Sequence, residues 1–280
     1  MIYLIVAILF GSLFAILFKL FAKHGVDALQ AIIFNYITAI AIGPLTNIIR
    51  GEVAFSALSA VPLLPAILTG LFMVGGFIAM SNATKSHGVA IATIATRVSF
   101  IIPTICAYLF LGEKGLEPTT SLMVIISLFM IFFTNRRGLT LNKWYNPLLV
   151  FLCYGAANFL LKYCQAQLDT NSELLALTTI TFTSALIIAI IFLRLQKGNL
   201  ANFKWKNLLA GVILGVTNIG CTFFLLKALT LFSTALLYPI YNISIVVTGI
   251  IAGRLIFKER LTTLQYIGIA IAITAIIIAL

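Results

Sequence analysis

Long uncharged apolar runs alternate with short polar breaks along the whole chain. A helix needs about 20 mainly apolar residues to cross roughly 30 Å of hydrocarbon, at a rise of about 1.5 Å per residue. Runs of this length occupy residues 2–22, 28–49, 62–83, 88–111, 119–135, 145–165, 172–194, 206–229, 233–256 and 261–280. The pattern therefore predicts ten transmembrane helices.

The breaks between these runs carry charged and turn-forming residues, as at Arg50-Gly51-Glu52 and Asp169-Thr170-Asn171. None of the breaks is long enough for a soluble domain. Runs near 20 residues exclude the roughly ten-residue alternation of a transmembrane barrel, and backbone groups in hydrocarbon must then bond within helices. The predicted fold class is an all-α polytopic membrane protein.

Composition and charge support this reading and exclude others. The chain is 62% hydrophobic and 9% charged, far from the balance of a soluble domain. The net charge of +11 would suit nucleic acid on a soluble protein. Here the basic residues gather in short connections such as Asn135-Arg136-Arg137 and Lys204-Trp205-Lys206, where they suit an anionic membrane surface. We expect the lipid bilayer, and no nucleic acid, as a partner.

A short motif occurs twice and divides the chain into two halves. Leu109–Lys114 ends the fourth predicted helix and Leu255–Arg260 ends the ninth, with their glutamates 146 residues apart. Each motif is followed by one last apolar run. A unit of five helices must enter the membrane from opposite sides when it is repeated in tandem. We therefore predict two inverted repeats, residues 1–137 and 138–280, with substrate bound where they meet.

These motifs resemble those of the ten-helix EamA-type proteins of the drug/metabolite transporter superfamily, in which each half closes with a similar Gly-Glu turn before its final helix. The likeness also includes residues 227–262 and Gly268. One departure is that many relatives carry a proline 13 residues before the motif glutamate, where this chain has Phe100 and Val246. The resemblance implies a helical bundle around a central cavity and transport of amino acids or other metabolites, often outward.

Arg97 is the most informative single residue, because it lies near the middle of the 88–111 run. A charge at that depth costs about 2.5 to 3.5 kcal/mol on insertion scales and normally faces a cavity or a partner. All seven acidic residues fall in loops or at helix ends. A substrate carboxylate or phosphate is the partner we expect. The alternatives are a structural strut that bonds backbone carbonyls or Tyr and Asn side chains, or a reentrant bend.

Other polar residues at mid-helix extend the candidate substrate-binding site. Thr93 and Thr96 continue the polar stripe of Arg97, and Tyr238, Tyr241 and Asn242 share one face of the ninth helix. Four further candidates lie away from helix ends: Asn35, Tyr36, Asn158 and Asn218. Each of these residues could instead be an interfacial anchor or could hold helices together.

Two features at helix ends and bends carry structural expectations. Pro239 lies between the two candidate tyrosines and favours a broken or bent helix. Lys19, Lys162 and Lys227 lie within about a turn of helix ends, where a long side chain reaches water at little cost. We expect these lysines to be structural.

The sequence offers little enzyme chemistry. It contains two histidines, no HExxH motif and no phosphate-cradling glycine loop. The four cysteines lie in or beside apolar runs without metal-ligand spacing. We predict a protein that is not an enzyme, with no cofactor and no metal.

The predicted function is secondary transport of a small polar metabolite, such as an amino acid or organic anion, by alternating access. Without an intramembrane carboxylate, facilitated diffusion or exchange is favoured over proton antiport. The alternatives are export of drugs or lipophilic compounds and a membrane subunit without transport. Basic residues are concentrated after odd-numbered helices, which places both termini outside. We expect a monomer or homodimer in a bacterial inner membrane.

Overall fold

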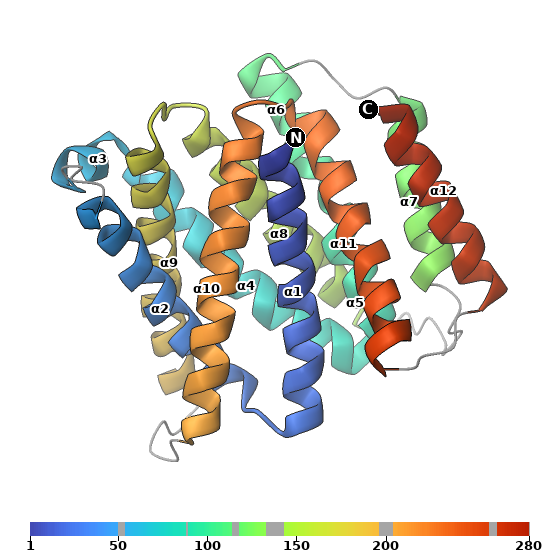
Figure 1. Ribbon diagram of the computed structural model, residues 1–280, viewed down its shortest axis with the longest axis horizontal. Helices are drawn as coiled ribbons and strands as arrows, with labels where there is room; N and C mark the ends of the chain where they lie inside the picture. The colour runs from blue at the N-terminus through green and yellow to red at the C-terminus, as the bar shows by residue number, and fades with distance from the viewer. Residues whose placement is uncertain are drawn as a thin grey trace. The chain divides into compact units, whose positions relative to one another are not determined.

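The computed structural model describes residues 1–49, 54–87, 89–113, 118–132, 143–195, 204–257 and 262–279, and in these ranges the regular structure is entirely α-helical (Figure 1). The helices are α1 (Ile2–His24), α2 (Ala28–Ile49), α3 (Ala54–Ala60), α4 (Leu63–His87), α5 (Val89–Val98), α6 (Ile101–Leu111), α7 (Pro118–Phe132), α8 (Tyr145–Gln165), α9 (Asn171–Leu195), α10 (Trp205–Leu229), α11 (Thr234–Phe257) and α12 (Thr263–Ala279).

The helix bounds follow the apolar runs of the sequence closely. Each predicted range except 88–111 coincides with one helix, and 88–111 contains both α5 and α6. The short α3 was not predicted, since its seven residues are too few to form a membrane-length run. The boundary predicted between residues 137 and 138 lies outside the described residues.

Six helical stretches in the described ranges are long and apolar enough to cross a membrane: Leu63–His87, Ile91–Leu111, Tyr145–Gln165, Asn171–Phe192, Trp205–Leu229 and Thr234–Ala252. Shorter apolar stretches occupy Ile2–Phe14, Gln30–Thr46 and Thr263–Ala275. The prediction of an all-helical membrane protein is confirmed. The count of ten crossings and the inverted relation of the halves remain predictions.

The chain divides into two compact units. The first combines residues 1–74 with 160–231, and the second combines residues 75–159 with 232–280. Each unit therefore takes segments from both predicted repeats. The repeats, if present, are units of sequence, whereas the packed units are built from helices of both halves.

In the first unit, α10 packs against α1 and α2, and α2 also packs against α9. Gly215 allows the close approach of α2 and α10, because a Cβ added there would lie 2.6 Å from Thr38 Cβ and 2.7 Å from the Asn35 carbonyl oxygen. The start of α2 is capped by Asp27, whose carboxylate accepts the Gln30 N–H at 3.1 Å. Small residues and caps thus fix the helices of this unit.

In the second unit, α12 packs against α7, and the two helices run side by side in Figure 1. The remaining contacts join α11 to α6, α7 and α12, and join α5 to α7. Gly155 of α8 packs directly against the Ile102 side chain of α6, where a larger residue would not fit. These contacts position the polar residues of α5, α8 and α11.

The interruption between α5 and α6 falls at Ser99 and Phe100, two residues after Arg97. Pro103 explains it, because proline has no N–H and its ring clashes with a helical carbonyl four residues earlier, which here is that of Ser99. The Ser99 carbonyl instead accepts the Ile102 N–H at 3.1 Å. By contrast, α11 continues through Pro239. Of the two alternatives expected at Pro239, the break is therefore wrong and the bend remains a prediction.

Candidate functional site

Arg97 lies in the last turn of α5, half-buried, directly before the interruption. Its Nη1 donates a hydrogen bond to Asn242 Oδ1 of α11 at 3.2 Å. The Asn242 amide is oriented from its other end, because Nδ2 donates to the Tyr238 carbonyl oxygen at 2.9 Å. The guanidinium is therefore held by a side chain that is itself fixed by its own helix.

α8 supplies two more residues of this cluster. The Tyr238 hydroxyl donates to the backbone carbonyl oxygen of Asn158 at 3.1 Å. Tyr154, one turn before Asn158, packs with Met80 and Ala95 against the buried cluster that includes Ala92 of α5. Its ring packs on Gly76 of α4, where an added Cβ would lie 3.0 Å from Cε2. The site is thus built from α4, α5, α8 and α11 of the second unit.

Tyr154 was not predicted, although the sequence contains a signal for it. It lies four residues before Asn158 and therefore shares a helix face with this predicted site residue. Tyrosine is also common at membrane interfaces, so its presence in an apolar run does not by itself indicate a binding site.

The two threonines of α5 have different surroundings. Thr96 Oγ1 donates to the Ala92 carbonyl oxygen at 3.0 Å and contacts Met80 Sδ at 3.3 Å. Thr93 is partly buried on the same helix, and Tyr241 is 9% exposed on α11. Thr93, Thr96 and Tyr241 lie in the second unit with Arg97, and a role in binding remains a prediction for each.

Three predicted residues belong to the first unit. Asn218 Nδ2 of α10 donates to Asn35 Oδ1 of α2 at 3.1 Å, with Asn35 fully buried. Tyr36 is buried, and its ring centroid lies 5.9 Å from that of Phe182. These contacts join helices within the unit and support the packing alternative for all three.

A buried cation also lies in the first unit. Lys162 Nζ donates to Gln165 Oε1 at 2.9 Å and to the carbonyl oxygen of Leu229, the last residue of α10, at 3.2 Å. The side chain is 5% exposed, so the expectation that it extends to water is wrong. Its ammonium bonds a carbonyl at the negative end of a helix, where a cation is stabilising.

Acidic side chains are scarce among the described residues of the second unit. The single acidic residue in that part of the chain is Glu113, whose Oε2 accepts the backbone N–H of Thr234 at 2.6 Å. The hydrogen bond from Arg97 Nη1 is accepted by a neutral amide, that of Asn242. The arrangement is therefore able to hold an anionic group by charge as well as by hydrogen bonds.

The fold defines a class, that of helical integral membrane proteins. A solved crystal structure matches the fold with a TM-score of 0.75 at 14% sequence identity, covering 99% of this chain and 95% of that chain. A protein of Haemophilus influenzae, described as uncharacterized, is 28% identical over 98% of this chain and 95% of its own length.

A family model matches the second half of the chain. Residues 144–280 match the EamA-like transporter family. This match confirms the predicted resemblance to EamA-type transporters over the second half of the chain. The corresponding relation of the first half remains a prediction.

Proposed function

We propose that the chain is a secondary carrier that exports or exchanges a small anionic or zwitterionic metabolite, such as an amino acid. The observation that carries this proposal is the Arg97–Asn242 pair in the second unit. A charge within an apolar span costs several kcal/mol and is normally retained for function. The planar guanidinium presents N–H donors in a fork that matches a carboxylate or phosphate.

The neutral groups around Arg97 supply orientation in this proposal. Tyr241, Thr93 and Thr96 carry hydroxyls, and Tyr238, Asn242 and Asn158 hold the frame around the guanidinium. A few polar groups in an otherwise apolar site are typical of small-molecule binding. The Asn35–Asn218 pair and Tyr36 fit helix packing better than substrate contact.

Alternating access is the mechanism that the proposed inverted repeats, 1–137 and 138–280, would support. The EamA match at 144–280 falls within the second of these repeats. Exchange is favoured over proton coupling because the seven acidic residues of the chain fall in loops or at helix ends. In a bacterial inner membrane, the distribution of basic residues places both termini outside, which tags at each end would test.

The decisive experiment is exchange transport in proteoliposomes. Purified protein is reconstituted with each of the twenty radiolabelled L-amino acids, with succinate and with glycerol 3-phosphate. We expect trans-stimulated uptake of at least one of these compounds, and loss of that uptake in Arg97→Ala. Absence of exchange with every compound would contradict the proposal. Ethidium transport that is unchanged in Arg97→Ala would instead favour a drug exporter.

A further inference from the structure

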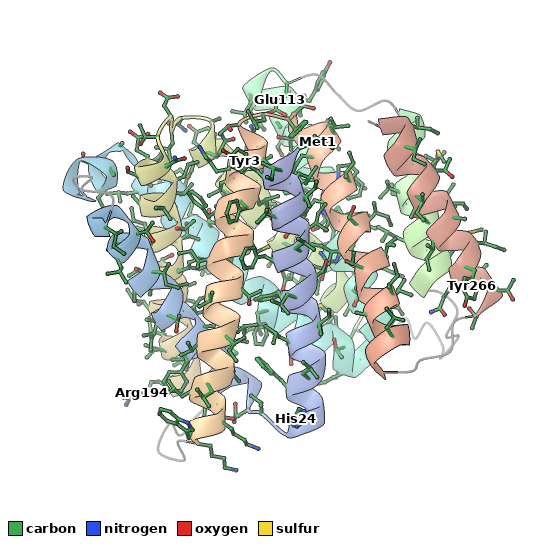
Figure 2. The ribbon with its side chains drawn as sticks, viewed as in Figure 1. Met1, Tyr3, His24, Glu113, Arg194 and Tyr266 are labelled. Atoms are coloured by element: carbon green, nitrogen blue, oxygen red, sulfur yellow. The ribbon has the colours of Figure 1, made fainter. Side chains whose placement is uncertain are left out.

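Glu113, the glutamate of the Leu109–Lys114 motif, makes a contact that substrate binding by Arg97 does not by itself explain. α6 ends at Leu111, and Gly112 then adopts the left-handed conformation with φ 65°. The N–H groups of Gly112 and Glu113 both bond to the Ala107 carbonyl oxygen, that of Glu113 at 3.3 Å. This turn directs the chain away from the axis of α6 and places Glu113 beyond its end (Figure 2).

The Glu113 carboxylate caps a different helix of the same unit. Its Oε2 accepts the backbone N–H of Thr234, the first residue of α11, at 2.6 Å. The first N–H groups of a helix have no partner within it and form the positive end of its dipole. Thr234 is fully buried. The bond is therefore charge-assisted, and it is part-buried.

Hydrogen bonds from outside α11 support its first turn. Pro239 has no N–H, so the Ala235 carbonyl oxygen lacks its usual donor four residues later. The turn is held from outside α11 by Glu113 at Thr234 and by the Tyr238 hydroxyl on the Asn158 carbonyl oxygen. The first bond joins α11 to the turn that follows α6, and the second joins it to α8.

A series of hydrogen bonds connects this turn to Arg97. Tyr238 lies one helical turn after Thr234, and its carbonyl oxygen accepts Asn242 Nδ2. Asn242 Oδ1 in turn accepts Arg97 Nη1. The position of the first turn of α11 therefore determines the position of the Asn242 amide, which holds the Arg97 guanidinium.

We propose that Glu113 is a positioning residue of the substrate site. By capping α11 it fixes the Arg97–Asn242 pair in the geometry that receives the anionic group of the substrate. The proposal deepens the function argued above and rests on it. It also gives the Gly112-Glu113 turn of this chain a task, since Gly112 supplies the left-handed bend and Glu113 supplies the cap.

Transport kinetics test the proposal with a matched control. Glu113→Ala is compared with Glu113→Gln, whose amide oxygen still accepts the Thr234 N–H. The control is Glu173→Ala, because Glu173 also caps a helix start, accepting the Asp169 and Thr170 N–H groups at 2.9 and 3.0 Å, in the first unit. The probe is the radiolabelled amino acid that the wild type exchanges fastest.

We expect KM to rise about fivefold in Glu113→Ala, the size of effect typical of a lost helix cap. Glu113→Gln should recover much of this change, and Glu173→Ala should leave KM unchanged. In an Asn242→Ala background, Glu113→Ala should add little, because the residue through which it acts is gone. Equal KM changes in Glu113→Ala and Glu173→Ala, or full additivity with Asn242→Ala, would overturn the proposal.

Hydrogen exchange of the substrate-free protein tests the same idea without transport. In Glu113→Ala, amides of residues 234–246 and of the Arg97 turn should exchange faster, whereas Glu173→Ala should affect the start of α9 alone. Unchanged exchange at residues 234–246 would overturn the positioning role. If the wild type transports none of the probes yet this exchange pattern appears, the proposed function fails while the cap stands.

Discussion

The two units of the protein hold their cations in different ways. In the first unit, Lys162 bonds an amide and a backbone carbonyl at the end of α10, which are fixed acceptors. In the second unit, Arg97 bonds the side chain of Asn242 next to a helix interruption. A cation that bonds a backbone carbonyl stabilises the fold. A cation that bonds a side chain beside a helix interruption is better suited to bind a substrate. The comparison predicts different consequences of removing each charge.

The largest effect is expected from Arg97. Arg97→Ala should lower kcat/KM for exchange about 100-fold, because a charge-assisted hydrogen bond to substrate contributes about 1.5 to 3 kcal/mol. Arg97→Lys should retain part of the activity, since it keeps the charge and loses the fork. Uptake in proteoliposomes measures both, with size-exclusion profiles as the control for folding. A fully active Arg97→Ala protein would remove the basis of the comparison.

The next effect concerns Lys162. Lys162→Met should destabilise the protein by about 2 kcal/mol, because Gln165 Oε1 and the Leu229 carbonyl oxygen lose their donor inside the fold. Thermal unfolding in detergent measures this change. Lys227→Met is the matched control, since Lys227 lies over the Tyr3 ring at 5.7 Å and should contribute about 0.5 kcal/mol. Equal destabilisation by the two changes would contradict a structural role specific to Lys162.

A third prediction tests the packing of the first unit without touching a charge. Gly215→Ala should cost about 1 to 3 kcal/mol, because the new Cβ would overlap Thr38 and the Asn35 carbonyl oxygen. Gly249→Ala is the control in the second unit, where nothing lies within 4 Å of an added Cβ. Thermal unfolding of both variants should separate them, and similar values would argue against the close approach of α2 and α10.

The smallest effect should come from the asparagine pairs. Asn218→Ala should cost about 0.6 kcal/mol of stability, an average value for a polar contact between membrane helices, and leave KM unchanged. Asn242→Ala should instead raise KM, since it removes the acceptor of Arg97. Parallel unfolding and uptake measurements test the contrast. A raised KM in Asn218→Ala would assign the first-unit pair to the substrate site after all.

Some of the site was accessible from the sequence and some was not. Arg97 was visible because a charge within an apolar run is expensive wherever its partner lies. Its bond to Asn242 joins residues 145 positions apart, and the burial of Lys162 depends on the end of another helix. The Tyr154 ring packs against Gly76, and the sequence around either residue does not indicate this contact. The interruption at Ser99 follows from Pro103, whereas the similar residue Pro239 leaves α11 continuous.

The sequence by itself determined the helices and their membrane class, because apolar runs of membrane length with charged ends leave the backbone no other way to satisfy its hydrogen bonds. The tertiary structure decided which polar residues act together. It paired Asn35 with Asn218 in the first unit, and it brought Glu113 to the start of α11 in the second. Helix formation is local in the chain, whereas the partners of a polar side chain are chosen by how helices pack.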